Sequence, residues 1–163
     1  MLMIRILGLA SLATAFVSCE STSSPASSSG GQKIGGVKTT AYTHTESDHK
    51  IYGTGSATGS NLKYGHVRSA AADWSVYPVG TVFQIDGDPY VYQIDDYGSA
   101  LVGTNTIDLY KPSKNSMKEW GARNVNINVI KWGSFRQSLV IMKTREKKAT
   151  HVHQMVKRIE TSS

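Results

Sequence analysis

The feature that most constrains the fold is the alternation of polar and apolar residues over positions 124–132, which is strict as far as Val129. Successive side chains of a β-strand point to opposite faces, so Val125, Ile127 and Val129 would share one face. The segment therefore predicts a half-buried β-strand.

Other short segments carry similar signals. Residues 81–85 alternate, stop at the turn-forming residues 86–89 and resume over 90–94, which predicts a hairpin. Residues 37–43 are β-branched and aromatic, and residues 113–121 fit a short helix that Ser113 caps and Gly121 ends. Short strands joined by glycine-rich turns predict a small barrel.

The N-terminal segment is typical of a secretory signal. Arg5 precedes an apolar run over 6–17, shorter than the roughly 20 residues that span a bilayer. Residues 16–19 (FVSC) resemble a bacterial lipoprotein signal, in which Cys19 becomes the lipidated first residue. The uncharged Ser/Gly-rich stretch over 21–31 predicts a flexible tether. Cleavage that leaves a free thiol, or a buried N-terminal helix, are the alternatives.

These patterns divide the chain into a signal peptide (1–18), a tether (19–33), a barrel domain (34–136) and a basic tail (137–163). In the tail, Val152, Met155, Val156 and Ile159 fall at helical spacing among lysines and arginines. We expect an amphipathic helix that packs on the barrel, and contact with a membrane or polyanion is the alternative. The net charge of +6 favours an anionic partner.

Three aspartates are the candidate chemical groups. Asp73, Asp96 and Asp108 lie among apolar, aromatic or small residues, where carboxyl groups are often partly buried and suited to general acid catalysis. Taken singly, each is more often structural, so the hypothesis depends on all three together.

Several short motifs occur in a fixed order along the chain, and the segment they span covers about residues 37–132. They are TAYT (40–43), ATG (57–59), AD (72–73), PVGT (78–81), DYGSA (96–100), IDLY (107–110) and GARNV (121–125). The set resembles the three-aspartate (3D) domain, which is found in the catalytic part of membrane-bound lytic transglycosylase A and in small muralytic proteins. The resemblance implies a mainly β fold, a six-stranded double-psi β-barrel with a short helix and a C-terminal helical tail.

The resemblance also implies a reaction. The β-1,4 bond between N-acetylmuramic acid and N-acetylglucosamine of peptidoglycan would be cut without water, leaving a 1,6-anhydro-muramyl end. Asp108, in the IDLY motif, would be the single general acid/base. Asp96 would lie nearby and stabilise the oxocarbenium-like transition state, and Asp73 would support both through hydrogen bonds.

Five further residues are candidate substrate contacts. Tyr42, Trp74, Tyr97 and Tyr110 would stack on sugar rings or, alternatively, pack in the core. Lys63 would contact the glycan or a carboxylate, or else be solvated.

A non-catalytic alternative is a peptidoglycan-binding or wall-loosening, expansin-like module. The stretch between Asp96 and Asp108 is one residue longer than in the family pattern, which favours this module. The presence of all three aspartates favours the enzyme. No cofactor, metal or nucleic acid is expected, because a single cysteine excludes a Cys-based zinc site and no nucleic-acid motif is found. The i,i+2 pair His151 and His153 would point apart on a helix.

A second histidine group, His44 and His49 with Asp48, has no further metal ligand in the sequence.

The expected location is the cell envelope, through a lipid anchor at Cys19. Glu20 stands where an Asp would favour the inner membrane, so the periplasmic face of the outer membrane is expected.

Overall fold

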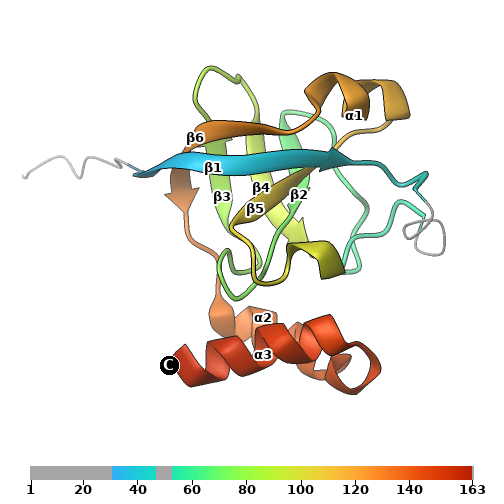
Figure 1. Cartoon of the computed structure of the whole chain (residues 1–163), viewed down its shortest axis with the longest axis vertical. Coiled ribbons are helices and arrows are strands. Elements are labelled where there is room, and N and C mark those ends of the chain that lie inside the picture. The colour runs from blue at the N-terminus through green and yellow to red at the C-terminus, as the bar shows by residue number, and fades with distance from the viewer. Residues whose placement is uncertain (1–30, 47–52, 163) are drawn as a thin grey trace, which may run out of the picture.

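The computed structural model describes residues 31–46 and 53–162, and within them a closed six-stranded β-barrel confirms the predicted fold (Figure 1). The strands are β1 (Gln32–Tyr42), β2 (Val67–Ala71), β3 (Val82–Ile85), β4 (Val91–Asp96), β5 (Thr106–Tyr110) and β6 (Arg123–Lys131). Around the barrel they follow the order β1-β5-β2-β4-β3-β6. The pairs β1/β5 and β2/β4 are parallel, and the other pairs are antiparallel.

The barrel interior is filled by alternate residues of the strands. Because side chains of a strand alternate between its faces, every second residue reaches the core. The fully buried members from the strands include Val37, Ala70, Phe83, Tyr92, Ile94, Ile107 and Leu109. The intervening residues point outward, and it is these that form the candidate site.

Several local predictions are confirmed. β3 and β4 form the predicted hairpin, with Gln84 opposite Val91, and β6 buries Ile127 and Val129 as its alternation predicted. β1 begins at Gln32, so the last two residues of the predicted tether (19–33) belong to the barrel. The predicted signal peptide, Cys19 and the rest of the tether to residue 30 lie outside the described residues.

A short helix, α1 (Lys114–Trp120), lies where the sequence predicted it. The Ser113 side chain accepts a hydrogen bond from the Ser116 backbone N–H, as an N-cap does. Gly121 ends the helix at φ 63°, a conformation that glycine adopts without a steric penalty.

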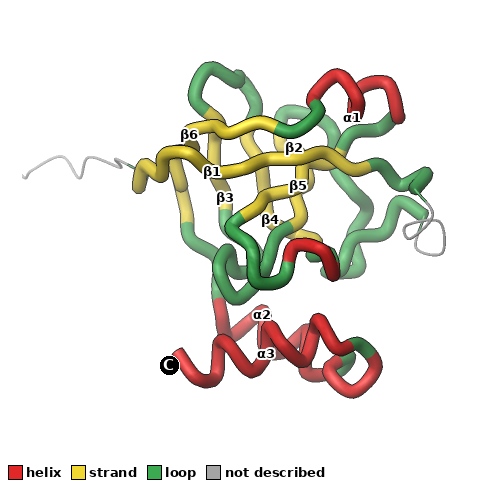
Figure 2. Tube along the Cα trace, in the orientation of Figure 1, coloured by secondary structure: helices red, strands yellow, loops and turns green. Residues whose placement is uncertain are grey.

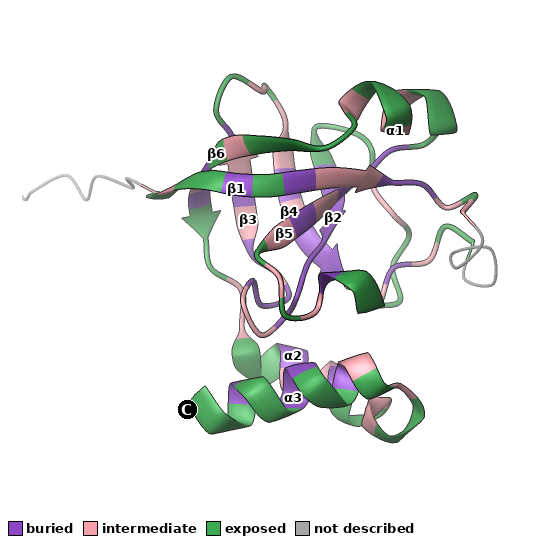
Figure 3. Ribbon diagram, viewed as in Figure 1, coloured by how far each residue is buried: buried purple, intermediate pink, exposed green. Residues whose placement is uncertain are grey.

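The C-terminal tail forms two helices, α2 (Phe135–Lys143) and α3 (Thr150–Ser162), which lie together across one end of the barrel (Figures 1 and 2). Two 3-10 turns, η1 (Ser99–Leu101) and η2 (Glu146–Lys148), complete the elements. The apolar stripe predicted for the tail is buried on α3 (Figure 3). α2 was not predicted as a separate helix.

Within the described residues, no helix has the length and apolar character needed to cross a membrane.

Candidate functional site

A row of side chains crosses four neighbouring strands on the outside of the barrel. Thr40 of β1 pairs with Asp108 of β5, Asp108 pairs with Ala71 of β2, and Ala71 pairs with Asp96 of β4. Residues that pair side by side in a sheet point to the same face. The two predicted aspartates therefore flank Ala71, roughly 10 Å apart at their Cα atoms from two strand spacings.

A β-bulge brings a third carboxylate to this face. The pairing of β2 with β4 shifts between Ala70, which pairs with Ile94, and Ala71, which pairs with Asp96. Asp95 is the extra residue, and a bulge of this kind re-aims the side chains beside it. Ile94 points into the core, whereas Asp95 and Asp96 both make their contacts outside it.

Asp96 is buried and held by several donors. Its Oδ1 accepts from the backbone N–H groups of Ala57 and Tyr97, at 3.1 and 3.0 Å. Its Oδ2 accepts from the Tyr42 hydroxyl at 3.1 Å. Burial and the neighbouring carboxylates raise the pKa of Tyr42 well above its usual value, so this hydroxyl keeps its proton and donates. An ionised carboxylate only accepts hydrogen bonds, so these donors suit it.

Asp108 is half-buried, as is Thr40 beside it in the row. Its Oδ1 accepts a hydrogen bond from the Thr40 hydroxyl at 2.7 Å. Next to it on the same face lie Tyr42 and Tyr110, with ring centroids 5.6 Å apart, in a small apolar cluster that also contains Ala71. Both tyrosines are buried, so little of either ring faces solvent.

Asp95 is a site residue that sequence reasoning missed. Its Oδ2 accepts from Ser69 at 2.7 Å and from the Lys63 ammonium at 3.1 Å. Lys63 thus contacts a carboxylate, one of the alternatives predicted for it, and also donates to Gln93 at 3.0 Å. Burial raises the pKa of Asp95, against the lowering effect of Ser69 and Lys63. The doublet of consecutive aspartates at the end of an apolar strand was the available signal.

Asp73 has a different place from the one predicted. It is fully buried, and its Oδ1 accepts from the backbone N–H and hydroxyl of Ser75, at 2.8 and 2.6 Å. Its Oδ2 accepts from the Gly103 N–H at 2.7 Å, and Arg158 of α3 lies 3.5 Å away. These bonds join the segment after β2, the loop before β5 and the C-terminal helix. They replace the predicted hydrogen bonds to the other two aspartates, because Asp73 lies beyond the end of β2.

The remaining aromatic candidates differ in exposure. Trp74 is fully buried, so it takes the core position that was one of its two alternatives, and its indole N–H donates to the Asp96 carbonyl at 2.8 Å. Tyr97 is half-buried and packs edge-on against Trp74. Arg145, from the segment after α2, donates to the Tyr97 hydroxyl at 3.3 Å and to the Ala57 carbonyl at 2.9 Å.

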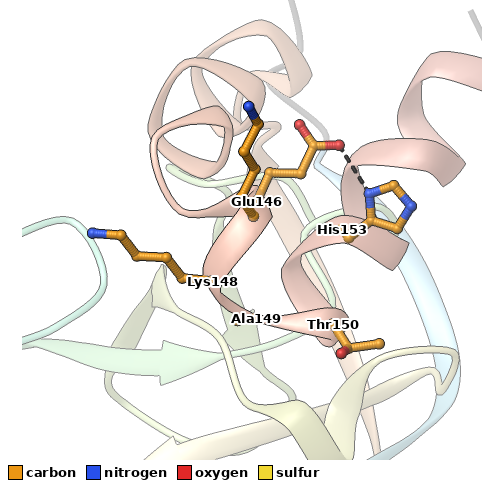
Figure 4. A pocket seen from close by; sticks show the side chains of 6 residues that line it. Glu146, Lys148, Ala149, Thr150 and His153 are labelled. Atoms are coloured by element: carbon orange, nitrogen blue, oxygen red, sulfur yellow. Dashed lines mark hydrogen bonds and ion pairs between the residues drawn. The ribbon is translucent and has the colours of Figure 1, made fainter.

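A hollow of about 420 Å³ lies between η2 and the start of α3 (Figure 4). It is lined by Glu146, Thr150 and His153 among others, and the Glu146 carboxylate contacts His153 Nδ1 at 3.0 Å. None of the aspartates of the row lines this hollow, so it is separate from the candidate site.

Within the described residues, no group of three or more His, Cys, Asp or Glu side chains is placed to hold a metal ion. His44 instead shares a hydrogen bond with the Tyr110 hydroxyl at 2.8 Å. Asp48 and His49, the other members of that predicted group, lie outside the described residues.

Comparison with known proteins finds a family match over part of the chain. Residues 68–131, which run from β2 to the end of β6, match the family described as 3D domain. The chain is 35% identical over 99 residues to "Putative cell wall shaping protein YabE" of Bacillus subtilis (strain 168), covering 60% of this chain and 23% of that protein. It is 34% identical over 92 residues to "Cell wall-binding protein YocH" of the same organism, covering 56% of this chain and 31% of that protein. The match therefore spans less than a third of either relative.

Proposed function

We propose that the protein is a peptidoglycan lytic transglycosylase, on the basis of the match of residues 68–131 to the 3D domain family. The observation that carries the proposal is the placement of Asp108 and Asp96 on either side of Ala71 on one outer face. Both relatives bear names that refer to the cell wall, which supports the same substrate.

In the proposed reaction Asp108 is the single general acid/base. Its carboxyl group protonates the glycosidic oxygen as the bond to C1 of N-acetylmuramic acid breaks, and N-acetylglucosamine leaves with a 4-hydroxyl. The 6-hydroxyl of the same muramyl residue then attacks C1, and its proton returns to Asp108. An ordinary glycosidase needs two carboxyl groups for acid and nucleophile or base roles, but here the substrate supplies the nucleophile. The half-exposed position of Asp108 supports its access to the bond.

Asp96 has a different proposed role, as a fixed negative charge. Three donors hold its carboxylate in one orientation. A preorganised charge stabilises the positive charge that develops at C1 without reorganising during the reaction. Asp73 would act on the site indirectly, by holding the segment after β2 and the loop before β5.

Glycan contact is assigned by exposure. Among the predicted contacts, Lys63 and Tyr97 are partly exposed, so we propose that these two contact the sugars. The buried Tyr42 and Tyr110 would lie beneath the bound glycan strand, and Trp74 would support the site from the core.

We also propose that the barrel is displayed in the cell envelope. In this proposal residues 1–18 direct secretion, Cys19 carries a lipid anchor, and the tether links the anchor to β1. The membrane that holds the anchor would be the outer membrane in a cell that has one. The basic charge of the chain suits an anionic wall and an anionic lipid surface.

The second candidate is a wall-binding module without turnover. It is supported by the name of the relative called a cell wall-binding protein. In this alternative the row of side chains would bind glycan through hydrogen bonds but would not cleave it.

The test is mass spectrometry of purified peptidoglycan incubated with the protein and with Asp108→Asn. We expect anhydro-muropeptides with the parent and none with the variant. The matched control is Asp86→Asn, which makes the same change on an exposed turn of the β3/β4 hairpin. Products with reducing ends would replace the transglycosylase with a hydrolase. No release, with the protein still pelleting with the wall, would leave the binding module.

A further inference from the structure

A second cluster of side chains, at the end of the barrel that carries α1, alternates positive charges with aromatic rings (Figure 1). This end is opposite α2 and α3. We call the cluster the cation–aromatic ladder, and it consists of Tyr90, Arg68, Tyr64, Lys111, Trp120 and Arg123.

Each cation of the ladder lies over at least one ring. The Arg68 guanidinium carbon is 3.2 Å from the ring centroid of Tyr90 and 4.1 Å from that of Tyr64. The Lys111 ammonium is 5.8 Å from the centroid of Tyr64 and 4.6 Å from that of Trp120. Cations within about 6 Å of a ring centroid are attracted by the ring, most strongly where water is excluded.

The far end of the ladder is exposed. The Arg123 guanidinium carbon lies 4.3 Å from the Trp120 centroid, and Arg123 donates hydrogen bonds to the Glu119 and Trp120 carbonyls. The ladder therefore runs from a buried arginine to an arginine at the surface.

The ladder cations have no ion-pair partner among the described residues. Within the described part of the chain, none of Arg68, Lys111 and Arg123 forms an ion pair, although Lys111 is only 5% exposed and Arg68 only 8%. Burial lowers the pKa of Lys111, and the positive charges of the two arginines lower it further. Asp88 and Glu119 oppose this only at longer range. A buried, unpaired ammonium lowers the stability of a fold, so packing alone is a poor reason for it.

The ladder adjoins the row of aspartates. Tyr64 lies edge-on to Tyr110, with ring centroids 6.3 Å apart at 89°. Tyr110 is two residues after Asp108 on the same outer face of β5. A polymer bound over Asp108 would therefore place its side branches within reach of the ladder.

We propose that the cation–aromatic ladder binds carboxylate groups of the peptides that branch from the glycan strand. This inference rests on the proposed function, because it takes the wall polymer as the molecule that lies over Asp108. Arginine and lysine N–H groups form charge-assisted hydrogen bonds with carboxylates, which are stronger than bonds to neutral hydroxyls. The rings hold the cations in place, and an incoming carboxylate supplies the missing counter-charge.

The test uses the full chain and Lys111→Met, in a co-sedimentation assay with purified peptidoglycan stripped of phosphate polymers. Methionine keeps the length of the side chain between the two rings but removes the charge. We expect about tenfold weaker binding for Lys111→Met, the size of one modest charge pair. The control is Lys157→Met, an exposed lysine of α3 at the opposite end, which should bind as the parent does.

A second arm uses the same peptidoglycan with its peptide carboxylates converted to amides. There the parent should weaken to the level of Lys111→Met, and the variant should lose little more. Urea unfolding should show Lys111→Met at least as stable as the parent, since an unpaired buried charge is removed.

Other outcomes would overturn the proposal. One is equal binding of peptidoglycan by the parent and by Lys111→Met. Another is that Lys111→Met weakens binding to the same extent on untreated and on amidated peptidoglycan. A third is that the parent binds only when phosphate polymers are left in place. Failure of the proposed function is distinguishable, because cleavage products then stay absent while the Lys111 dependence of binding persists. If the parent does not bind peptidoglycan at all, both proposals are wrong.

Discussion

Replacing Asp73 by Asn tests whether this aspartate is a structural group rather than a chemical one. The change keeps the shape of the side chain but exchanges one acceptor oxygen for an NH2 group. With its oxygen toward Ser75, the amide would turn its N–H groups toward the Gly103 N–H that now donates at 2.7 Å. A hydrogen bond to a charged group contributes about 1.5–3 kcal/mol, so we expect the free energy of unfolding to fall by about 2–3 kcal/mol.

The measurement is urea unfolding followed by tryptophan fluorescence, for which the adjacent Trp74 is a buried reporter. Arg158→Gln is the control, because its half-exposed guanidinium lies 3.5 Å from Asp73 and such a pair contributes below about 1 kcal/mol. The reasoning is refuted if Asp73→Asn unfolds like the parent yet no longer releases muropeptides, since Asp73 would then take part in the chemistry itself.

Two further predictions concern the row of aspartates. Tyr42→Phe removes the buried hydroxyl that donates to Asp96, so the free energy of unfolding should fall by about 2 kcal/mol and muropeptide release should slow; unchanged unfolding would contradict the bond. Burial raises the pKa of Asp95 above 3.8, so the folded protein holds that proton more tightly than the unfolded chain. The stability that protonated Asp95 contributes is therefore lost as pH rises from 3.8 through its higher pKa in the folded protein. Asp95→Asn should gain stability relative to the parent as pH rises from about 4, until Asp95 is ionised in the folded protein, measured by urea unfolding at each pH; a difference that stays constant with pH would contradict it.

The parts of the fold that the sequence predicts are those with local causes. Turn residues specify the hairpin, a capping serine specifies the start of α1, and a period-two pattern specifies β6. Each of these signals lies within about ten residues of sequence. β2 has no such pattern, because four of its five residues are buried, so residues that point to either face are shielded from solvent. α2 was missed because its sequence buries only Ser138 and Met142, too few to mark a stripe.

The candidate site shows the same division. Asp96 and Asp108 were selected from the sequence, but their position beside Ala71 depends on pairings between strands that are far apart in the chain. Asp95 reaches the site only because β4 contains a bulge, and nothing in its local sequence specifies one. The place of Asp73 depends on Gly103 and Arg158, which come from distant segments.

We expect the pair of C-terminal helices to belong to the smallest unit that folds. The family match ends at residue 131, yet Ser138 accepts the Val79 N–H and the Met155 sulfur accepts the Trp74 N–H. A fragment cut at 131 would expose the apolar groups under α2 and α3 and leave these buried donors without partners. The two helices therefore cover one end of the barrel and complete its packing. A fragment that contains the segment matched to the 3D family should include residues up to 162, and without them it should lose its cooperative unfolding.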